Sequence, residues 1–404
     1  MAIKTIIDGS LLAECEMKGP IRFGMHRVAE DINRLLLLNN SLDISFTNTI
    51  YSWEYHSNLK KYLKENCPAY VNKVLSMPPY LNPLPSKVNK ITNHFHFIKM
   101  MGLQVSINDI TKNDLFFSYY YPFPKKIMTS GIKKCITLLD IIPLRMKGYN
   151  KEVIDLTKEI IECIVPNFAV SISGFTRQDL CNYNKHVDPE RIFVIPLAAS
   201  KELFFVNSDK DRWNQIKKKY ELPDRYFLSV SSIDDRKNLP HLIKSFSKFV
   251  LQQNPKDLFL VLTGNCTYGY SVLEKLGIEK KVREKIVLAK SIANEDLSVV
   301  YSNAQWFFFM SLYEGFGLPA LEAMQCGTPV VTSNTTSLPE VVGDAGIMID
   351  PTDEDNLCET MNMLYHNEAL RNTYSQKGLE RSQQFSWERC ANEYVEIFKK
   401  IATN

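Results

Sequence analysis

Residues 306–333 carry the pattern that most restricts what this chain can fold into. The aromatic run 306–310 (WFFFM) is typical of a buried strand, and Pro319 then begins a helical pattern at a first-turn position, where its missing N–H costs nothing. Gly327 ends that helix, and residues 328–332 (TPVVT) return to the β-branched chemistry of a strand. Strand, loop, helix and strand form the unit of a parallel sheet, in which ligands bind at loops after the carboxyl ends of strands.

The loop inside this unit combines glycines with a carboxylate. The backbone N–H groups around Gly315, Gly317 and Leu318 are expected at a helix N-terminus, which favours an anion such as phosphate. Glu314 and Glu322 flank the turn, and ionised carboxylates only accept hydrogen bonds, so we expect them to face hydroxyl groups. A ligand with phosphates and hydroxyls suggests a nucleotide sugar. The alternative is that the helix dipole alone favours one glutamate and that the other is simply solvated.

Length and composition limit the class of protein. With 404 residues the chain is long enough for two domains with separate cores. Its 45% hydrophobic and 23% charged residues are ordinary for a soluble globular protein, and a net charge of +3 gives no argument for a nucleic-acid partner. No signal peptide is visible, and no segment approaches the roughly 18 apolar residues of a membrane helix. Nine cysteines without CxxC spacing fit a reducing cytoplasm and argue against structural zinc.

Short strands alternate with helices in both halves of the chain. The predicted strands are 4–7, 136–139, 168–172, 192–195, 226–230, 258–263 and 286–288, and the predicted helices are 27–38, 152–163, 239–251 and 295–304. The polar, lysine-rich stretch 199–222 breaks the alternation, so we place a domain boundary there. The sequence thus predicts an α/β protein with two doubly wound domains, residues 1–198 and 199–386, and a cleft between them. Between residues 51 and 126 the pattern is poor, and the prolines and aromatics of MPPYLNPLPSK and YYYPFPKK are interpreted as long loops.

Several segments resemble the family-four retaining glycosyltransferases, which have the GT-B fold of two Rossmann-like domains. SLYEGFGLPALEAMQCGTPVVTSNTTSLPEVVGDAGIMIDP resembles the family signature, and YFLSVSSIDDRKNLPHLIKSF resembles the segment that brings a basic residue onto the donor pyrophosphate. VSISGFTRQDL, DPERIFVIP and FSWERCANEYVEIF match further segments in the expected order, so the resemblance covers most of residues 130–400. The first 130 residues match weakly, through FGMHRVAEDI, which has Gly24 and Arg27 at the matching positions.

The resemblance implies roles for particular residues. Glu314 is expected to contact hydroxyls of the donor sugar and Glu322 the nucleotide ribose, while Lys237, with Arg236 beside it, neutralises the departing diphosphate. The first domain is expected to bind the acceptor, with a C-terminal helix at about 387–402 packed back on it. The remaining expected donor contacts are Gly315, Phe316, Gly317, Leu318, Ser232, Gly264 and Ile292, and the expected acceptor or phosphate loop contains Gly24 and Arg27.

The chain also departs from the family pattern. Many members carry an arginine where this chain has Ser231 and Ser232, and many carry a histidine where it has Leu139. Asp140 follows and is a candidate to orient the acceptor or sugar, although an aspartate at a strand end is as often a helix or turn cap. For the Arg236 and Lys237 pair, the alternative is a solvated turn before a helix capped by Asn238.

Three short motifs have simpler explanations than a metal site. Residues 209–211 (DKD) fit the spelling of a metal-binding DxD motif but lie in the polar stretch, and residues 353–355 (DED) are explained by helix capping. His94 and His96 lack acidic or cysteine partners nearby. We therefore expect a metal-independent enzyme with no cofactor. Residues 119–126 (YYYPFPKK) could touch a bilayer, but a loop with exposed lysines is the alternative.

The predicted function is a retaining transfer of a hexose from a nucleoside diphosphate sugar to a saccharide or lipid-linked acceptor. The RKN turn favours bacterial mannosyltransferases of surface polysaccharide or lipopolysaccharide, which makes GDP-mannose the first donor to consider. The protein is expected in the cytoplasm, with at most peripheral contact at the inner face of the membrane. The alternatives are a sugar-nucleotide epimerase or phosphorylase on the same fold, and a catalytically inactive nucleotide-sugar-binding scaffold.

Overall fold

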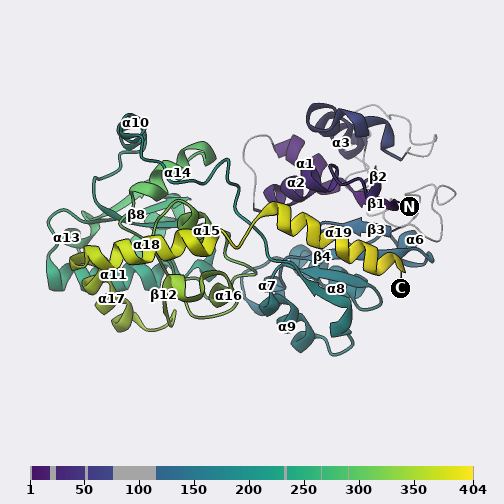
Figure 1. The fold of residues 1–404 in the computed structure, drawn as a ribbon. Helices are drawn as coiled ribbons and strands as arrows, with labels where there is room; N and C mark the ends of the chain where they lie inside the picture. The colour runs from purple at the N-terminus through teal and green to yellow at the C-terminus, as the bar shows by residue number, and fades with distance from the viewer. Residues whose placement is uncertain are drawn as a thin grey trace, which may run out of the picture. The chain divides into compact units, whose positions relative to one another are not determined.

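The chain forms two compact units, Met1–Pro196 with Trp387–Asn404, and Leu197–Ser386 (Figure 1). The computed structural model describes residues 2–18, 24–50, 53–75, 115–231, 234–264, 266–289 and 291–403. Each unit contains a six-stranded sheet, and the strand pairs in these residues are parallel. The predicted α/β class with two doubly wound sheets is confirmed.

The first unit has strand order β2-β1-β3-β4-β5-β6. Its strands are apolar over most of their length because helices cover both faces of a parallel sheet. Its elements are β1 (Ile3–Asp8), α1 (Ser10–Lys18), α2 (Gly24–Leu36), β2 (Leu42–Thr47), α3 (Trp53–Asn66), η1 (Pro68–Lys73), β3 (Leu115–Ser118), α6 (Lys125–Met128), β4 (Lys133–Leu138), α7 (Ile142–Arg145), α8 (Lys151–Ile164), β5 (Phe168–Ser171), α9 (Gly174–Tyr183), η4 (Pro189–Arg191), β6 (Ile192–Val194) and α19 (Trp387–Thr403).

The last helix of the chain, α19, packs on α2, β1 and β3 of the first unit. The ring of Phe117 in β3 contacts Tyr394 and Phe398 of α19, with ring centroids 5.5 Å and 5.0 Å apart. The hydroxyls of Thr137 in β4 and Tyr394 lie 2.9 Å apart. Both the core and a buried hydrogen bond of the first unit therefore depend on residues that follow the second unit in sequence.

The second unit has strand order β12-β11-β10-β7-β8-β9. The chain passes from β7 outward to β9 and then returns to β10 on the other side of β7, so the order reverses between β7 and β10. Its elements are α10 (Lys210–Tyr220), β7 (Tyr226–Ser231), η5 (Asp235–Lys237), α11 (Leu239–Gln253), β8 (Phe259–Gly264), α12 (Cys266–Lys275), α13 (Lys280–Arg283), β9 (Ile286–Ala289), α14 (Asn294–Asn303), β10 (Trp306–Phe309), α15 (Leu318–Gln325), β11 (Val330–Ser333), α16 (Leu338–Val342), η6 (Gly343–Ala345), β12 (Gly346–Ile349), α17 (Glu354–His366) and α18 (Glu368–Ser382).

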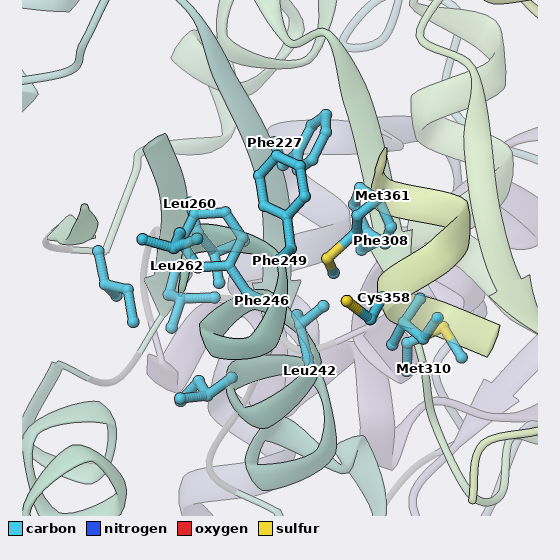
Figure 2. Packing of buried hydrophobic residues seen from close by; sticks show 14 of the residues in the cluster. Phe227, Leu242, Phe246, Phe249, Leu260, Leu262, Phe308, Met310, Cys358 and Met361 are labelled. Carbon is cyan, nitrogen blue, oxygen red and sulfur yellow. The ribbon is translucent and has the colours of Figure 1, made fainter. Parts of the chain in front are cut away.

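The core of the second unit lies between its central strands and the helix pair α11 and α17 (Figure 2). Phe227 of β7 packs on Phe308 of β10, with ring centroids 4.9 Å apart, and on Phe249 of α11 at 6.2 Å. Met361 of α17 is buried in the same cluster. Burial of several aromatic rings at the centre of the sheet fixes β7 and β10, and the candidate site described below lies at the carboxyl ends of these two strands.

The units divide after Pro196, within two residues of the predicted division after residue 198, and the polar stretch 199–222 contains a helix, α10, at residues 210–220. One apolar stripe anchors this charged helix: Ile216 is buried, and Trp213 stacks on Tyr226. On α14, the fully buried Asp296 accepts a hydrogen bond from Tyr220 at 2.9 Å and pairs with Lys219 at 2.7 Å and with Arg212. The lysine-rich composition reflects the exposed face of a docked helix.

The segment considered for bilayer contact contributes aromatic rings to the first core. Tyr119 and Phe123 are buried, and Phe123 packs edge-on against Phe116. Tyr121 donates a hydrogen bond to Glu14, while Lys125 is exposed. The loop interpretation of this segment is therefore the better one. Within the described ranges, no helix is long and apolar enough to cross a membrane.

Candidate active site

A pair of basic residues and a glutamate meet at the carboxyl ends of β7 and β10, where the strand order reverses. Ligands of open α/β sheets bind at such a reversal point. Arg236 and Lys237 lie in η5, the single turn that follows β7, and Glu314 lies in the loop between β10 and α15. The backbone N–H of Leu312 donates to the carbonyl of Arg236 at 2.7 Å, which ties the two loops together.

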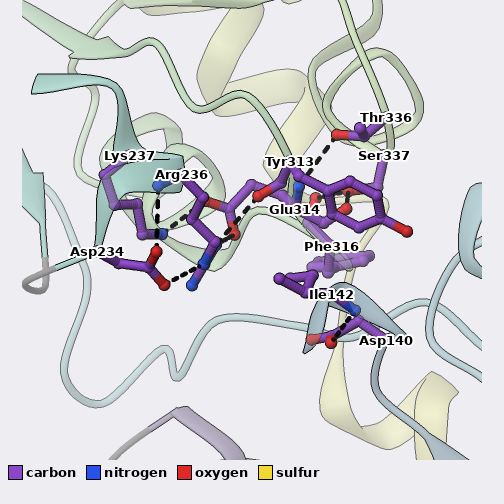
Figure 3. Close-up of polar contacts among 10 residues, drawn as sticks. All are labelled: Asp140, Ile142, Asp234, Arg236, Lys237, Tyr313, Glu314, Phe316, Thr336 and Ser337. Atoms are coloured by element: carbon purple, nitrogen blue, oxygen red, sulfur yellow. Dashed lines mark hydrogen bonds and ion pairs between the residues drawn. The ribbon is translucent and has the colours of Figure 1, made fainter. Parts of the chain in front are cut away.

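Glu314 forms ion pairs with both cations (Figure 3). Its Oε1 lies 2.6 Å from Nζ of Lys237, and its Oε2 lies 2.7 Å from a terminal guanidinium nitrogen of Arg236. Only 8% of the side chain is exposed for Lys237 and for Glu314. The alternative interpretation of a solvated basic turn is therefore wrong. The sequence did not predict Arg236 and Lys237 as partners of Glu314. Their two charges compensate the buried carboxylate, which would otherwise be strongly disfavoured.

Further contacts fix the two cations. Nε of Arg236 lies 2.7 Å from Oδ2 of Asp234, and its terminal nitrogen donates to the carbonyl of Tyr313 at 3.1 Å. The ammonium of Lys237 lies 4.6 Å from the ring centroid of Phe309, in cation–π contact. Both cations are thus held by several groups before any ligand is considered.

The pKa values of these groups follow from burial and from their neighbours. Burial alone would raise the pKa of Glu314, but the charges of Lys237 and Arg236 hold it below its ordinary value. Burial lowers the pKa of Lys237, and the Glu314 carboxylate offsets only part of that effect. Burial opposes the charge of Arg236, but Glu314 and Asp234 raise its pKa above the usual value. Glu314 and Arg236 are therefore ionised at neutral pH.

The loop from Glu314 to Leu318 is held by the segment after β11. The Ser337 hydroxyl lies 2.9 Å from the carbonyl of Glu314 and 2.8 Å from that of Phe316, and the Thr336 hydroxyl accepts from the Glu314 N–H at 3.2 Å. Gly317 is the N-cap of α15 with φ of +119°, a conformation that favours glycine. The loop is thereby placed at a helix N-terminus, the arrangement expected for an anion site.

The other predicted donor residues occupy the same unit. Glu322 is buried in α15 and accepts from the Tyr301 hydroxyl at 3.4 Å. Phe316 is buried and packs edge-on against Phe385. Gly264 ends β8 and Ile292 follows β9, which places both after carboxyl ends of strands in the same sheet. Ser232 lies outside the described residues.

Three predicted residues belong to the first unit. Gly24 begins α2 and Arg27 lies in its first turn. Asp140 follows β4, and its Oδ1 accepts from the backbone N–H of Ile142 at 3.0 Å (Figure 3). With this hydrogen bond Asp140 caps the turn after β4, which is the alternative to a role in orienting the acceptor or sugar. Leu139 precedes it in the position where many family members carry histidine.

The acidic motifs act as helix caps. Asp209 accepts from the N–H groups of Asp211 and Arg212 at the start of α10, and Asp353 accepts from that of Asn356 at the start of α17. In the part of the chain that the structure describes, no group of three or more His, Cys, Asp or Glu side chains is arranged to hold a metal. His94 and His96 lie outside that part.

Sequence reasoning missed three residues that build the site. Asp234 precedes Arg236 by two positions, and this spacing of a turn aspartate could have identified it. Ser337 reaches the site from the segment after β11, and Phe309 reaches it from the end of β10. No local sequence pattern marks either residue.

Residues 210–381 match the family model described as glycosyl transferases group 1. This range includes η5, the loop after β10 and α15. Residues 210–381 are a group 1 glycosyl transferase domain. Arg236, Lys237, Glu314 and Glu322 are all parts of this group 1 domain.

Two relatives are mannosyltransferases of Escherichia coli. O-antigen chain mannosyltransferase B is 34% identical over 235 residues, which make up 57% of this chain and 60% of that protein. Serotype-specific mannosyltransferase WbdA is 32% identical over 246 residues, which make up 58% of this chain and 28% of that protein. The matched part thus spans less than two thirds of the length of the first relative and less than a third of the second.

The fold has solved counterparts. The crystal structure of WaaG, a glycosyltransferase involved in lipopolysaccharide biosynthesis, matches with a TM-score of 0.62 at 14% identity and covers 98% of this chain and 99% of that one. At this identity the likeness shows the fold. The predicted GT-B fold, with the group 1 domain as one of its two Rossmann-like units, is confirmed.

Proposed function

We propose that this chain is a retaining glycosyltransferase that moves a hexose from a nucleoside diphosphate sugar to a hydroxyl of a saccharide or lipid-linked saccharide. The observation that carries the proposal is the partly buried pair Arg236 and Lys237, fixed against Glu314 beside the N-terminus of α15. Two immobilised cations beside the N-terminus of α15 suit a diphosphate, and a carboxylate among them suits sugar hydroxyls.

Catalysis in this proposal is stabilisation of the leaving group. As the bond from the sugar to the diphosphate breaks, negative charge develops on the bridging phosphate oxygen, and Lys237 and Arg236 are already placed to neutralise it. A single preorganised contact of this kind is typically worth about 3 kcal/mol of transition-state energy. Two fixed cations supply charge neutralisation without a metal, so the proposed reaction needs none. Glu314 would orient the sugar, and Glu322 would bind the nucleotide ribose.

The proposed donor is GDP-mannose, and the proposed acceptor is a growing surface polysaccharide. The support is that two relatives bear the name mannosyltransferase and that one of them is named for the O-antigen chain. A lipid-linked acceptor of this kind would place the enzyme in the cytoplasm, in peripheral contact with the inner face of the membrane.

We assign donor binding to the second unit and acceptor binding to the first. Gly24, Arg27 and Asp140 of the first unit are the proposed acceptor or phosphate contacts. The competing proposals are an epimerase, a phosphorylase and an inactive scaffold. The scaffold is favoured by the three departures from the family pattern, Leu139, Ser231 and Ser232.

A panel of nucleoside diphosphate sugars, screened by thermal shift and then by transfer to saccharide acceptors, tests the function. We expect GDP-mannose to raise the melting temperature and to be consumed, and Lys237→Met to lower turnover by about a hundredfold or more. The matched control is Lys244→Met, because Lys244 is half exposed on α11 and pairs with Glu354 at 3.3 Å.

The competing proposals give different results. Donor binding without transfer or hydrolysis in the wild type would favour the scaffold, and conversion of the donor without an acceptor would favour the epimerase. Equal turnover in the wild type and in Lys237→Met would contradict the assigned leaving-group role.

A further inference from the structure

Glu314 holds the two cations that the proposed diphosphate needs. Both of its carboxylate oxygens lie within 2.7 Å of a cationic nitrogen, one on Lys237 and one on Arg236. A diphosphate bound in the same place would seek these nitrogens. Glu314 and the diphosphate are thus two anions that use one pair of cations.

The formal charges of this cluster already cancel. Arg236 and Lys237 contribute two positive charges, and Asp234 and Glu314 contribute two negative charges. Asp234 is fixed to Arg236 twice, since its Oδ2 pairs with the side chain at 2.7 Å and its Oδ1 accepts from the backbone N–H at 3.1 Å. Glu314 is the carboxylate whose release would give the cluster a net positive charge for a diphosphate.

Release of a buried carboxylate requires replacement hydrogen bonds. The site excludes most solvent, because 8% of the Glu314 side chain is exposed, and a buried charge without partners is strongly disfavoured. Hydroxyls of the transferred hexose can supply those hydrogen bonds, whereas a nucleoside diphosphate lacks the hexose, and its ribose hydroxyls are assigned to Glu322.

We propose that Glu314 is an internal competitor of the diphosphate: it holds Lys237 and Arg236 against a nucleoside diphosphate and yields them to a ligand whose sugar hydroxyls take over its hydrogen bonds. This inference rests on the proposed function of the site. It makes the site selective for the intact nucleotide sugar over the nucleoside diphosphate product. After transfer the sugar has left, and Glu314 returns to the cations and helps to expel the product.

The test compares affinities of the wild type and Glu314→Gln for GDP, GDP-mannose and inorganic diphosphate by calorimetry. The variant should bind GDP and inorganic diphosphate about fivefold more tightly or better, the lower range of typical coupling between two ligands. It should bind GDP-mannose no more tightly, because the glutamine lacks a charged acceptor for sugar hydroxyls. The affinity for GDP therefore rises relative to the affinity for GDP-mannose in the variant. As a result, inhibition by the GDP product becomes stronger.

Asp235→Asn is the matched control. Asp235 is exposed in the same single turn, so its substitution removes one negative charge from the neighbourhood without releasing Lys237. We expect this control to change the affinities for all three ligands little and in parallel. An equal gain in diphosphate affinity in the control would show that net charge alone is responsible and would overturn the inference.

A second variant covers the case in which Glu314→Gln does not fold. Glu314→Asp keeps the charge but shortens the side chain by one methylene, so the carboxylate cannot reach both cations with the same geometry, and an intermediate gain in diphosphate affinity is expected. Weaker binding of GDP and inorganic diphosphate in these variants would mean that Glu314 braces Lys237 and would refute the inference.

The inorganic diphosphate measurement separates this inference from the proposed function. If the wild type binds no nucleotide sugar while diphosphate still gains affinity in Glu314→Gln, the donor assignment fails and the competition for the two cations stands. If GDP-mannose binds and is turned over while diphosphate gains nothing in the variant, the function stands and the inference fails.

Discussion

A Cβ atom added to Gly317 would lie 2.7 Å from Cδ2 of Leu338. The leucine is fully buried at the start of α16. The close approach of these two residues brings α16 and the segment before it onto the turn at the N-terminus of α15. It therefore links the positive φ of Gly317 to the placement of Ser337.

Gly317→Ala should destabilise the second unit and weaken donor binding. The alanine would combine overlap with Leu338 and a φ of +119°, and a strained conformation of this kind costs about 1–3 kcal/mol. Calorimetric unfolding and donor titration measure the two effects. Gly277→Ala is the control, because Gly277 also has a positive φ, of +60°, but open space around it. Equal losses in both variants would show that the Leu338 contact contributes nothing.

Ser337→Ala should loosen the loop that carries Glu314. The hydroxyl proton is shared between two carbonyls, and a buried carbonyl without its donor costs about 1–3 kcal/mol. We expect a lower melting temperature and a raised KM for the donor. In the control Ser247→Ala, the lost hydrogen bond runs to Ile243 within α11, and the donor KM should not change. A wild-type KM in Ser337→Ala would argue against this support for the loop.

Asp296→Asn should destabilise the docking of α10 in a pH-dependent manner. Burial opposes ionisation of Asp296, but the hydrogen bonds from Lys219 and Tyr220 and the nearby charges hold its pKa below the ordinary value. Its contribution is therefore complete above the usual pKa of about 4 and is lost as the pH falls through the lower folded value. Hydrogen bonds to a charged group suggest a loss of about 2 kcal/mol at pH 7.

Unfolding of Asp296→Asn and the wild type at pH 7 and near pH 3 measures this dependence. The difference in melting temperature should be large at pH 7 and should shrink in acid. Asp224→Asn is the control, since Asp224 pairs with Lys217 but is 81% exposed, and such pairs contribute little. A difference that grows in acid would have the wrong sign for this explanation.

Phe398→Ala should destabilise the first unit, although the residue lies near the C-terminus. Phe398 is fully buried against Phe117 and Tyr394, and truncation of a buried phenylalanine costs about 3–5 kcal/mol. Denaturant unfolding should show the loss. Lys399→Ala, on the exposed side of the same helix, should stay within about 0.5 kcal/mol of the wild type. Similar stability of the two variants would mean that α19 is not part of the core.

Local patterns predicted the elements around the site and missed the contacts between them. The WFFF strand and the helix that begins at Leu318 were readable because apolar runs, prolines and glycines act over a few residues. The start of β4 was missed because Lys134 is an unusual strand residue; its stem is buried while its ammonium donates to the carbonyls of Ser130 and Ile132.

The ion pairs of Glu314 could not be predicted from spacing. Lys237 and Glu314 are 77 residues apart, and their contact depends on which strands become neighbours in the sheet. The sequence identified both as functional candidates through the family resemblance, but it gave no reason for them to bind each other. The partners of Asp296 were missed for the same reason, since they lie on a helix within the stretch where a domain boundary was placed.

The position of α19 sets an order of events during synthesis. The strands of the first unit leave the ribosome early, but the helix that covers Phe117 is made only after all of the second unit. Domains generally fold as units while the chain grows. The second unit can therefore complete its core while the unit that was translated first still exposes apolar surface. A premature stop after Ser386 would spare the later half and leave the earlier one unfinished.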